Sequence, residues 1–246
     1  MVTTKESELE ASGPLASALS TFVSSHFDEM SPYSWQISDV TWSKLGTDFD
    51  YKKFSGDPPR QNIEMKQHLA KYWANASINE KIRVSKWIVS DWGGIHRNSD
   101  MTILGYINQA DAEYPATPFY GIASYSKILA IKAPEGYAVF DARVAASLNA
   151  VQLLLRREGK LTSPNLLGFL VPPGRNNIVN RFDSAAPPSV LQRLGFAVVE
   201  KDATYDIYLS ILRQMKPAVK KSILEIEMFL FAQADDLCER ALPLLA

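Results

Sequence analysis

The stretch that decides the fold is residues 121–149, GIASYSKILAIKAPEGYAVFDARVAASLN. Its first part has helical spacing up to Lys132, and the turn at residues 133–136, which contains a proline and a glycine, ends that helix. A short apolar run, residues 137–140, leads into Asp141. The next helix is predicted over residues 142–158, because its apolar positions recur on one face. The stretch therefore predicts two helices joined by a tight turn, with Asp141 at or near an N-cap.

Asp141 has two interpretations. Aspartate is among the best N-cap residues, and on spacing alone the cap explains it without a further role. The other interpretation is a catalytic carboxylate, which the helix dipole and the unpaired amides of the first turn keep ionised.

Helical spacing recurs along most of the chain, so we expect a mainly α fold. Ser77 and Glu80 match a capping box, which predicts the start of a helix at this point. Gly93 and Gly94 are expected to end the same helix. We predict one domain over residues 14–246, a helical body of one or two lobes with a cleft, after a disordered tail at 1–13. Further helices are predicted over residues 14–27, 62–76, 77–92, 99–113, 121–132, 188–194, 204–216 and 218–242.

An irregular, aromatic-rich segment interrupts this pattern between residues 31 and 61. Large aromatic rings gain free energy by burial, so the segment is expected to pack on the body rather than to act as a linker. A short strand is predicted at residues 36–42.

Composition narrows the classes of protein. The chain has 246 residues, 46% of them hydrophobic, a formal net charge of -1 and a single cysteine, Cys238. These values fit a globular protein without disulfides rather than a disordered chain or a coiled coil. The polar start resembles no secretion signal, and the apolar runs are shorter than the roughly 20 residues that span a bilayer. We therefore expect a cytoplasmic monomer that does not enter a membrane.

Common catalytic and cofactor motifs are absent from the sequence. The histidines at 26, 68 and 96 are isolated, and no C-x-x-C or H-E-x-x-H accompanies them, so neither a metal nor a cofactor is expected. No glycine-rich phosphate loop and no G-x-S-x-G elbow occurs. Charge is uneven, however. Residues 141–181 contain six basic and two acidic side chains. Residues 225–246 contain one basic and five acidic side chains. The basic stretch favours contact with an anion.

Several short motifs resemble those of one enzyme superfamily. They are S-K-x-L at residues 126–129, Y-x-x-x-D-x-R-V-A at 137–145, Trp92-Gly93, and E-x-E-M-x-L-F-A at 225–232. Together they resemble the helix-hairpin-helix DNA glycosylases, and more closely the bacterial 8-oxoguanine DNA glycosylase-like proteins. The resemblance covers scattered pieces between Trp92 and the C-terminus.

The resemblance implies roles for two residues. Asp141 matches the aspartate that stabilises positive charge on the deoxyribose while the bond to the base breaks. Members that also cleave the strand need a hairpin lysine as nucleophile, and Lys127 is the candidate. It precedes Asp141 by only 14 positions, nearer than the roughly twenty typical of the family, and the glycine-rich hairpin is missing. Lys127 therefore has an equal alternative as a surface or phosphate-contacting lysine, and we expect base release without strand cleavage.

Two further groups of candidate residues would contact double-stranded DNA that carries a modified base. Aromatic side chains can stack on an extruded base, although core packing is the commoner role for an aromatic at a helix end. Polar side chains can bind phosphates, with a solvated surface or a loop cap as the alternative. The aromatic candidates are Trp92, Tyr120 and Tyr125, and the polar ones are Arg97, Arg143, Arg175 and Asn176.

The sequence thus supports two functions of different classes. One is a DNA glycosylase that releases an oxidised purine or a phage-type modified base, in repair or in defence. The other is a catalytically inactive module on the same scaffold that binds DNA or a protein. The missing glycine-rich hairpin favours the module, and the retained Asp141 favours the enzyme.

Overall fold

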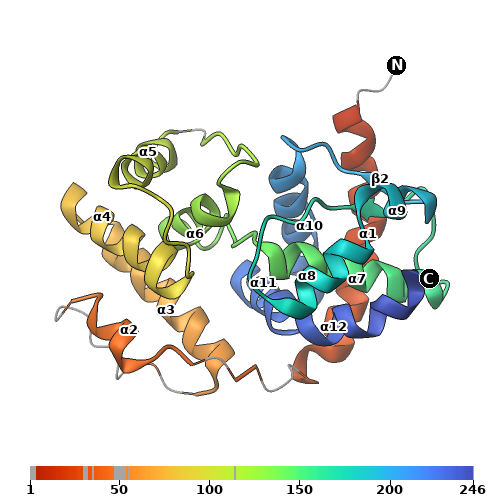
Figure 1. The fold of residues 1–246 in the computed structure, drawn as a ribbon, viewed down its shortest axis with the longest axis horizontal. Helices are drawn as coiled ribbons and strands as arrows, with labels where there is room; N and C mark the ends of the chain where they lie inside the picture. Colours follow the sequence, from red (N-terminus) through yellow and green to blue (C-terminus); the bar gives the residue numbers. More distant parts are fainter. Residues whose placement is uncertain are drawn as a thin grey trace. The chain divides into compact units, whose positions relative to one another are not determined.

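The computed structural model describes residues 4–29, 33–34, 36–46, 54, 56–113 and 115–245. The fold is mainly α, as predicted (Figure 1). In the described part, the strands are the two-residue β1 (Leu167–Gly168) and β2 (Ala197–Val198), which pair in parallel with Leu167 opposite Ala197.

The chain divides into two compact units, where a single domain of one or two lobes was expected. Unit 1 consists of Met1–Ser31, Thr117–Ile122 and Phe140–Ala246. Unit 2 consists of Pro32–Ala116 and Ala123–Val139. The unit boundary therefore falls just before Asp141, and each unit is described by itself below.

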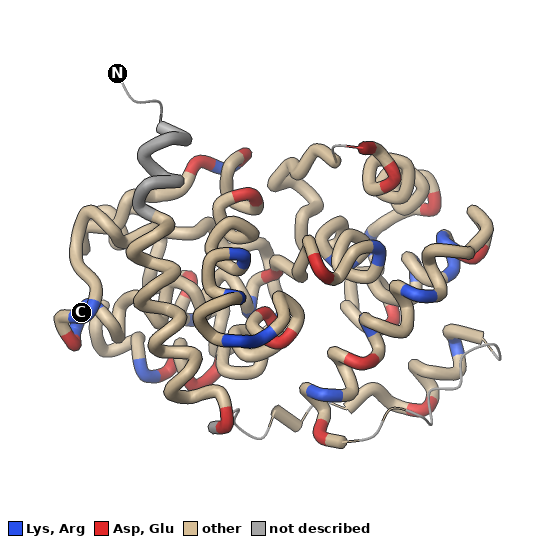
Figure 2. Tube along the Cα trace, turned by 180° about the vertical axis from the view of Figure 1, so that it is seen from behind, with Lys and Arg blue, Asp and Glu red and all other residues tan. Residues whose placement is uncertain are grey.

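Unit 1 is built around α7 (Ala142–Arg157). All but three of the 16 residues of α7 are buried, because α11 (Ile223–Ala232) and α12 (Ala234–Ala241) pack against it. α1 (Thr4–His26) packs along α10 (Thr204–Val219), and α8 (Asn177–Ala185) and α9 (Pro188–Arg193) complete the unit. Acidic and basic positions are interspersed along the trace (Figure 2).

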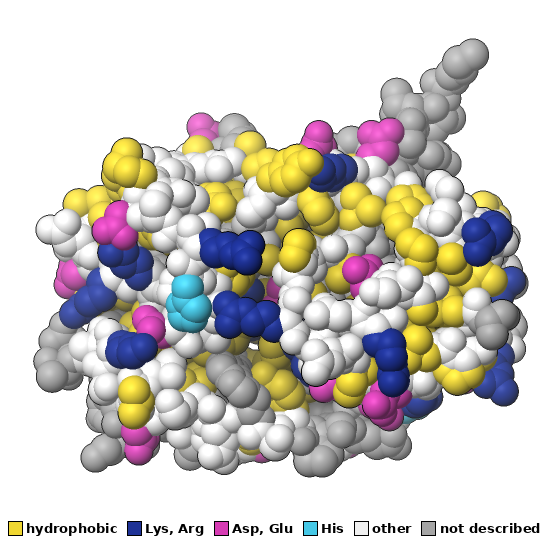
Figure 3. All heavy atoms as spheres, viewed as in Figure 1, with side chains coloured by type: hydrophobic (Ala, Val, Ile, Leu, Met, Phe, Trp, Pro, Cys, Tyr) yellow, Lys and Arg dark blue, Asp and Glu magenta, His cyan; other side chains and the backbone are white. Residues whose placement is uncertain are grey.

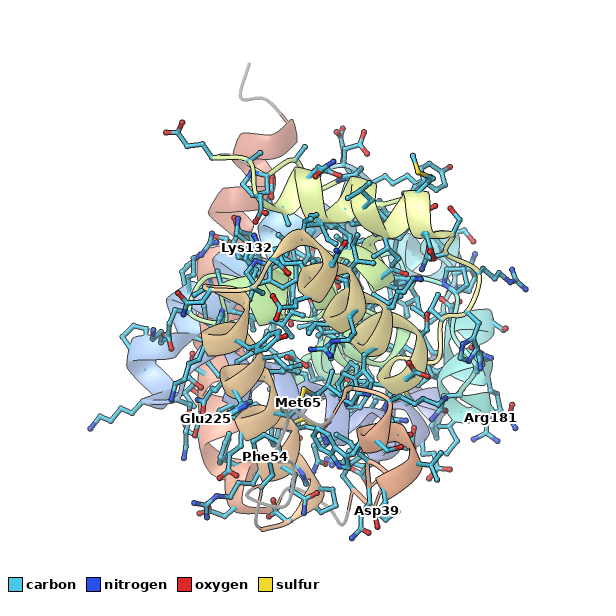
Figure 4. All side chains as sticks on the ribbon, turned by 90° about the vertical axis from the view of Figure 1, so that its left-hand side faces the viewer. Asp39, Phe54, Met65, Lys132, Arg181 and Glu225 are labelled. Atoms are coloured by element: carbon cyan, nitrogen blue, oxygen red, sulfur yellow. The ribbon has the colours of Figure 1, made fainter. Side chains whose placement is uncertain are left out.

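Unit 2 holds α2 (Asp39–Ser43), α3 (Pro58–Trp73), α4 (Ile78–Lys86), α5 (Asp100–Ala110) and most of α6 (Ile122–Lys132). After α4 the chain continues as a π-helical turn, η3 (Trp87–Trp92), and Gly93 caps it. Met65 of α3 is fully buried. Met65 and Phe54 are both labelled in Figure 4. Trp42 stacks on both Phe54 and Trp87, with ring centroids 5.4 Å apart in each pair. The described part of the aromatic-rich segment thus packs on the body, as expected.

Several predicted boundaries are confirmed. Ser77 and Glu80 form the capping box of α4, whose hydrogen bonds lower the pKa of Glu80 to about 2. α6 ends at Lys132, labelled in Figure 4, and α7 begins at Ala142 directly after Asp141.

Three predicted elements are wrong. α1 begins at Thr4, within the predicted tail, so Pro14 lies inside the helix rather than in its first turn; residues 1–3 lie outside the described part. Residues 39–43 form a helix instead of part of a strand, because the Ser38 hydroxyl accepts from the Thr41 amide and caps it. The last predicted helix is two helices, α11 and α12, which meet at Gln233.

Candidate functional site

Asp141 is the N-cap residue of α7, as predicted. One carboxylate oxygen accepts hydrogen bonds from the backbone amides of Arg143 and Val144, at 3.1 and 3.3 Å. The residue is extended, with φ −132° and ψ −173°, and it is partly buried. Two amides and the positive end of a long helix thus hold this carboxylate in one orientation.

The residue before Asp141, Phe140, belongs to a buried group of aromatic rings in unit 1. Phe140 is fully buried, and its ring centroid lies 5.1 Å from that of Tyr208 and 6.2 Å from that of Tyr205. Burial is the main cause that raises the pKa of Tyr208, and the negative charges of Glu227 and Asp141 raise it further. Tyr208 therefore keeps its proton over the physiological range and is a neutral phenol near two carboxylates.

Unit 2 contains a second notable group of side chains, centred on Trp92. Lys66 and Lys127 are only 1% and 2% exposed, and their ammonium nitrogens lie 5.6 and 5.8 Å from the Trp92 ring centroid. The indole nitrogen of Trp92 donates to the Oδ1 atom of Asn62 at 2.7 Å. We call Asn62, Lys66, Trp92 and Lys127 the tryptophan–lysine cluster. Cation–π attraction between each ammonium group and the Trp92 ring stabilises this cluster.

Lys127 is therefore not a surface lysine, so the surface part of the alternative is wrong. Its Nζ donates to the carbonyl oxygen of Ala123 at 2.8 Å, one turn earlier in α6. Its Cε atom lies 2.6 Å from the position that a Cβ atom on Gly93 would take. The absence of a side chain at Gly93 makes the room in which Lys127 lies.

Two of the predicted phosphate contacts have structural roles within unit 1. The Arg143 side chain is 17% exposed, and its guanidinium donates to the Phe231 carbonyl at 3.0 Å and pairs with Asp235 at 3.2 Å. Asn176 caps α8 through the amides of Ile178 and Val179 and donates to the same Asp235 at 2.9 Å. These bonds join α7, α8 and the start of α12.

The remaining candidate residues differ in exposure. Tyr125 is 1% exposed and stacks on Tyr106 at 5.3 Å between ring centroids, so it belongs to the core of unit 2 and has no accessible face for a base. Tyr120 is 78% exposed, and Arg97 and Arg175 are also exposed. The structure thus leaves Tyr120, Arg97 and Arg175 accessible, and it buries Trp92 and Tyr125.

The basic stretch at residues 141–181 does not form one surface. Arg143 is in the first turn of α7 and Arg157 at its end, about 21 Å apart along a helix that rises 1.5 Å per residue. Figure 3 colours the Lys and Arg side chains of the face that it draws, where acidic and uncharged side chains lie among them. Arg143 and Arg157 therefore do not lie side by side, although both belong to the basic stretch.

Sequence reasoning missed Asn62, Lys66 and Tyr208, all of which are buried. A signal was present for the first two, because Asn62 and Lys66 are four positions apart and so lie on one face of a helix. Among the described residues, no group of three or more His, Cys, Asp or Glu side chains is placed to hold a metal ion. No helix in that part of the chain is long and apolar enough to cross a membrane.

Comparisons with protein-family models, with curated proteins and with solved structures found no match to this chain. The chemistry of the site therefore rests on the residues described above.

Proposed function

We propose that this chain is a DNA N-glycosylase that releases a modified base by hydrolysis. The observation that carries the proposal is the Asp141 carboxylate, fixed by two backbone amides at the start of a buried helix. A carboxylate held in this way needs no reorganisation when positive charge develops beside it.

The chemistry follows from that charge. As the bond between the base and C1′ breaks, positive charge develops on the deoxyribose, and the Asp141 carboxylate stabilises it and orients a water molecule for attack on C1′. The base leaves with the bonding electrons, the water oxygen forms the new bond to C1′, and the proton that the water loses neutralises the departing base. The reacting atoms are inaccessible in stacked duplex DNA, so the nucleotide must first be extruded.

The base itself is to be identified by experiment. The purified protein is incubated with duplexes that each carry one modified base, including oxidised purines and bulky phage-type bases, and hot alkali then cuts any abasic site. Release of one class identifies the substrate. Tight binding to duplex DNA or to a protein, with no release from any duplex, would favour the inactive binding module instead.

We expect the product to be an abasic site in an intact strand. A nucleophilic lysine must reach C1′, and Lys127 is occupied by the Ala123 carbonyl within its own helix. Strands should therefore stay intact until alkali is added. A borohydride-trapped covalent adduct that disappears in Lys127→Met would contradict this and add lyase activity; methionine is chosen because it keeps most of the buried volume.

The two arginines should behave differently in DNA binding. Arg175 is exposed and has no ion pair within the described residues, so Arg175→Ala should lower the slope of log affinity against log salt concentration by about one. Arg143→Ala should instead lower the free energy of unfolding by about 1–2 kcal/mol, because the Phe231 carbonyl loses the guanidinium and Asp235 keeps only Asn176 as a donor. Salt titrations and denaturant melts of both variants test this pair. If the slope of log affinity against log salt concentration were the same in Arg175→Ala and in the parent chain, Arg175 would not contact DNA.

A further inference from the structure

Unit 1 contains a pocket of about 470 Å³ that the proposed function does not use. Its walls are mainly apolar, with Phe119, Phe169, Pro187 and Leu191 among them. Its volume lies in the range of small-molecule sites, which combine apolar walls with a few polar groups. Here the charged groups are Asp183 and Lys201.

Asp183 lies in the last turn of α8, whose exposed side carries Arg181, labelled in Figure 4. Within the described chain, no ion pair and no side-chain hydrogen bond holds the Asp183 carboxyl. Burial raises its pKa, so the carboxylate is poorly solvated. It also lies at the negative end of the helix dipole, and the last turn contains no basic residue that would offset it. Both effects favour a positive charge beside Asp183.

Lys201 does not supply that charge. Its ammonium nitrogen lies 3.4 Å from the ring centroid of Tyr120 and 5.7 Å from that of Phe119. Cation–π attraction holds it against these rings, and no ion pair joins it to Asp183 in the described structure. The carboxylate and the apolar walls are therefore left for a ligand.

We propose that this pocket binds an organic cation: an amine attached to an apolar ring, with the ammonium group on Asp183 and the ring against Phe169 and Pro187. The apolar walls remove the ring from water, and the ammonium compensates the desolvated carboxylate. This site involves neither Asp141 nor DNA, so the binding of an organic cation can be tested independently of the glycosylase activity.

The test compares two probes of nearly equal shape, benzylamine and benzyl alcohol, of which only the first is cationic at pH 7. Binding is measured by amide chemical shifts of the labelled full-length protein. We expect benzylamine to bind at least tenfold more tightly, with shifts centred on residues 169–171 and 183–188. Asp183→Asn should abolish the preference by weakening only benzylamine.

Asp202→Asn is the matched control. It removes the same charge from an exposed position next to Lys201 that does not line the pocket, so the preference should persist. Equal affinity for the two probes, shifts centred elsewhere, or a preference that survives Asp183→Asn would each overturn the proposal.

Discussion

Asp141→Asn is expected to lower the rate of base release at least a hundredfold while leaving the fold intact. The amide has the size of the carboxylate but no charge with which to stabilise the developing cation, and a hundredfold loss corresponds to about 2.7 kcal/mol in the activation barrier. Asparagine caps helices about as well as aspartate, so the start of α7 should survive the change. Single-turnover assays on the duplex identified as substrate measure the rate.

Asp57→Asn is the control for this variant. Asp57 is the exposed N-cap of α3 and accepts a hydrogen bond from the Arg60 amide at 3.0 Å, so it shares the structural role of Asp141 without its proposed chemistry. Base release should be unchanged in Asp57→Asn, and thermal melts of both variants should resemble that of the parent chain. Full activity in a folded Asp141→Asn protein would reduce Asp141 to a helix cap.

Gly93→Ala is expected to lower the free energy of unfolding by about 1–3 kcal/mol, an unusual result for a change that adds one methyl group. The new Cβ atom would lie 2.6 Å from the Cε atom of Lys127 and under 3.0 Å from the backbone oxygens of Ile88 and Val89. The backbone oxygens cannot rotate away, so either η3 or Lys127 must shift. Denaturant unfolding measures the loss.

Gly105→Ala should change the free energy of unfolding in the opposite direction. Gly105 is exposed in the interior of α5, and a Cβ atom there would meet nothing within 4 Å. Alanine restricts the unfolded chain and favours the helix, so the free energy of unfolding should rise by about 0.5–1 kcal/mol. If Gly93→Ala were as stable as Gly105→Ala, the close packing of Lys127 against Gly93 would be refuted.

Local chemistry was readable in the sequence wherever a few neighbouring residues decide the structure. The Ser77–Glu80 capping box, the end of η3 at Gly93 and the N-cap at Asp141 all depend on contacts within one turn of helix, and all were predicted. The same reasoning overlooked the second capping box, in which Ser222 and Glu225 begin α11 after the end of α10.

The sequence by itself determined the helical class of the protein and the position of Asp141, because helical spacing and caps are set by residues within a few positions of one another. Only the tertiary structure decided which charged side chains are buried. Arg143 turned out to pair with Asp235, 92 positions away, and Lys66 to share Trp92 with Lys127, 61 positions further along. Such partners meet because helices pack on one another, and burial then depends on the whole fold rather than on the local sequence.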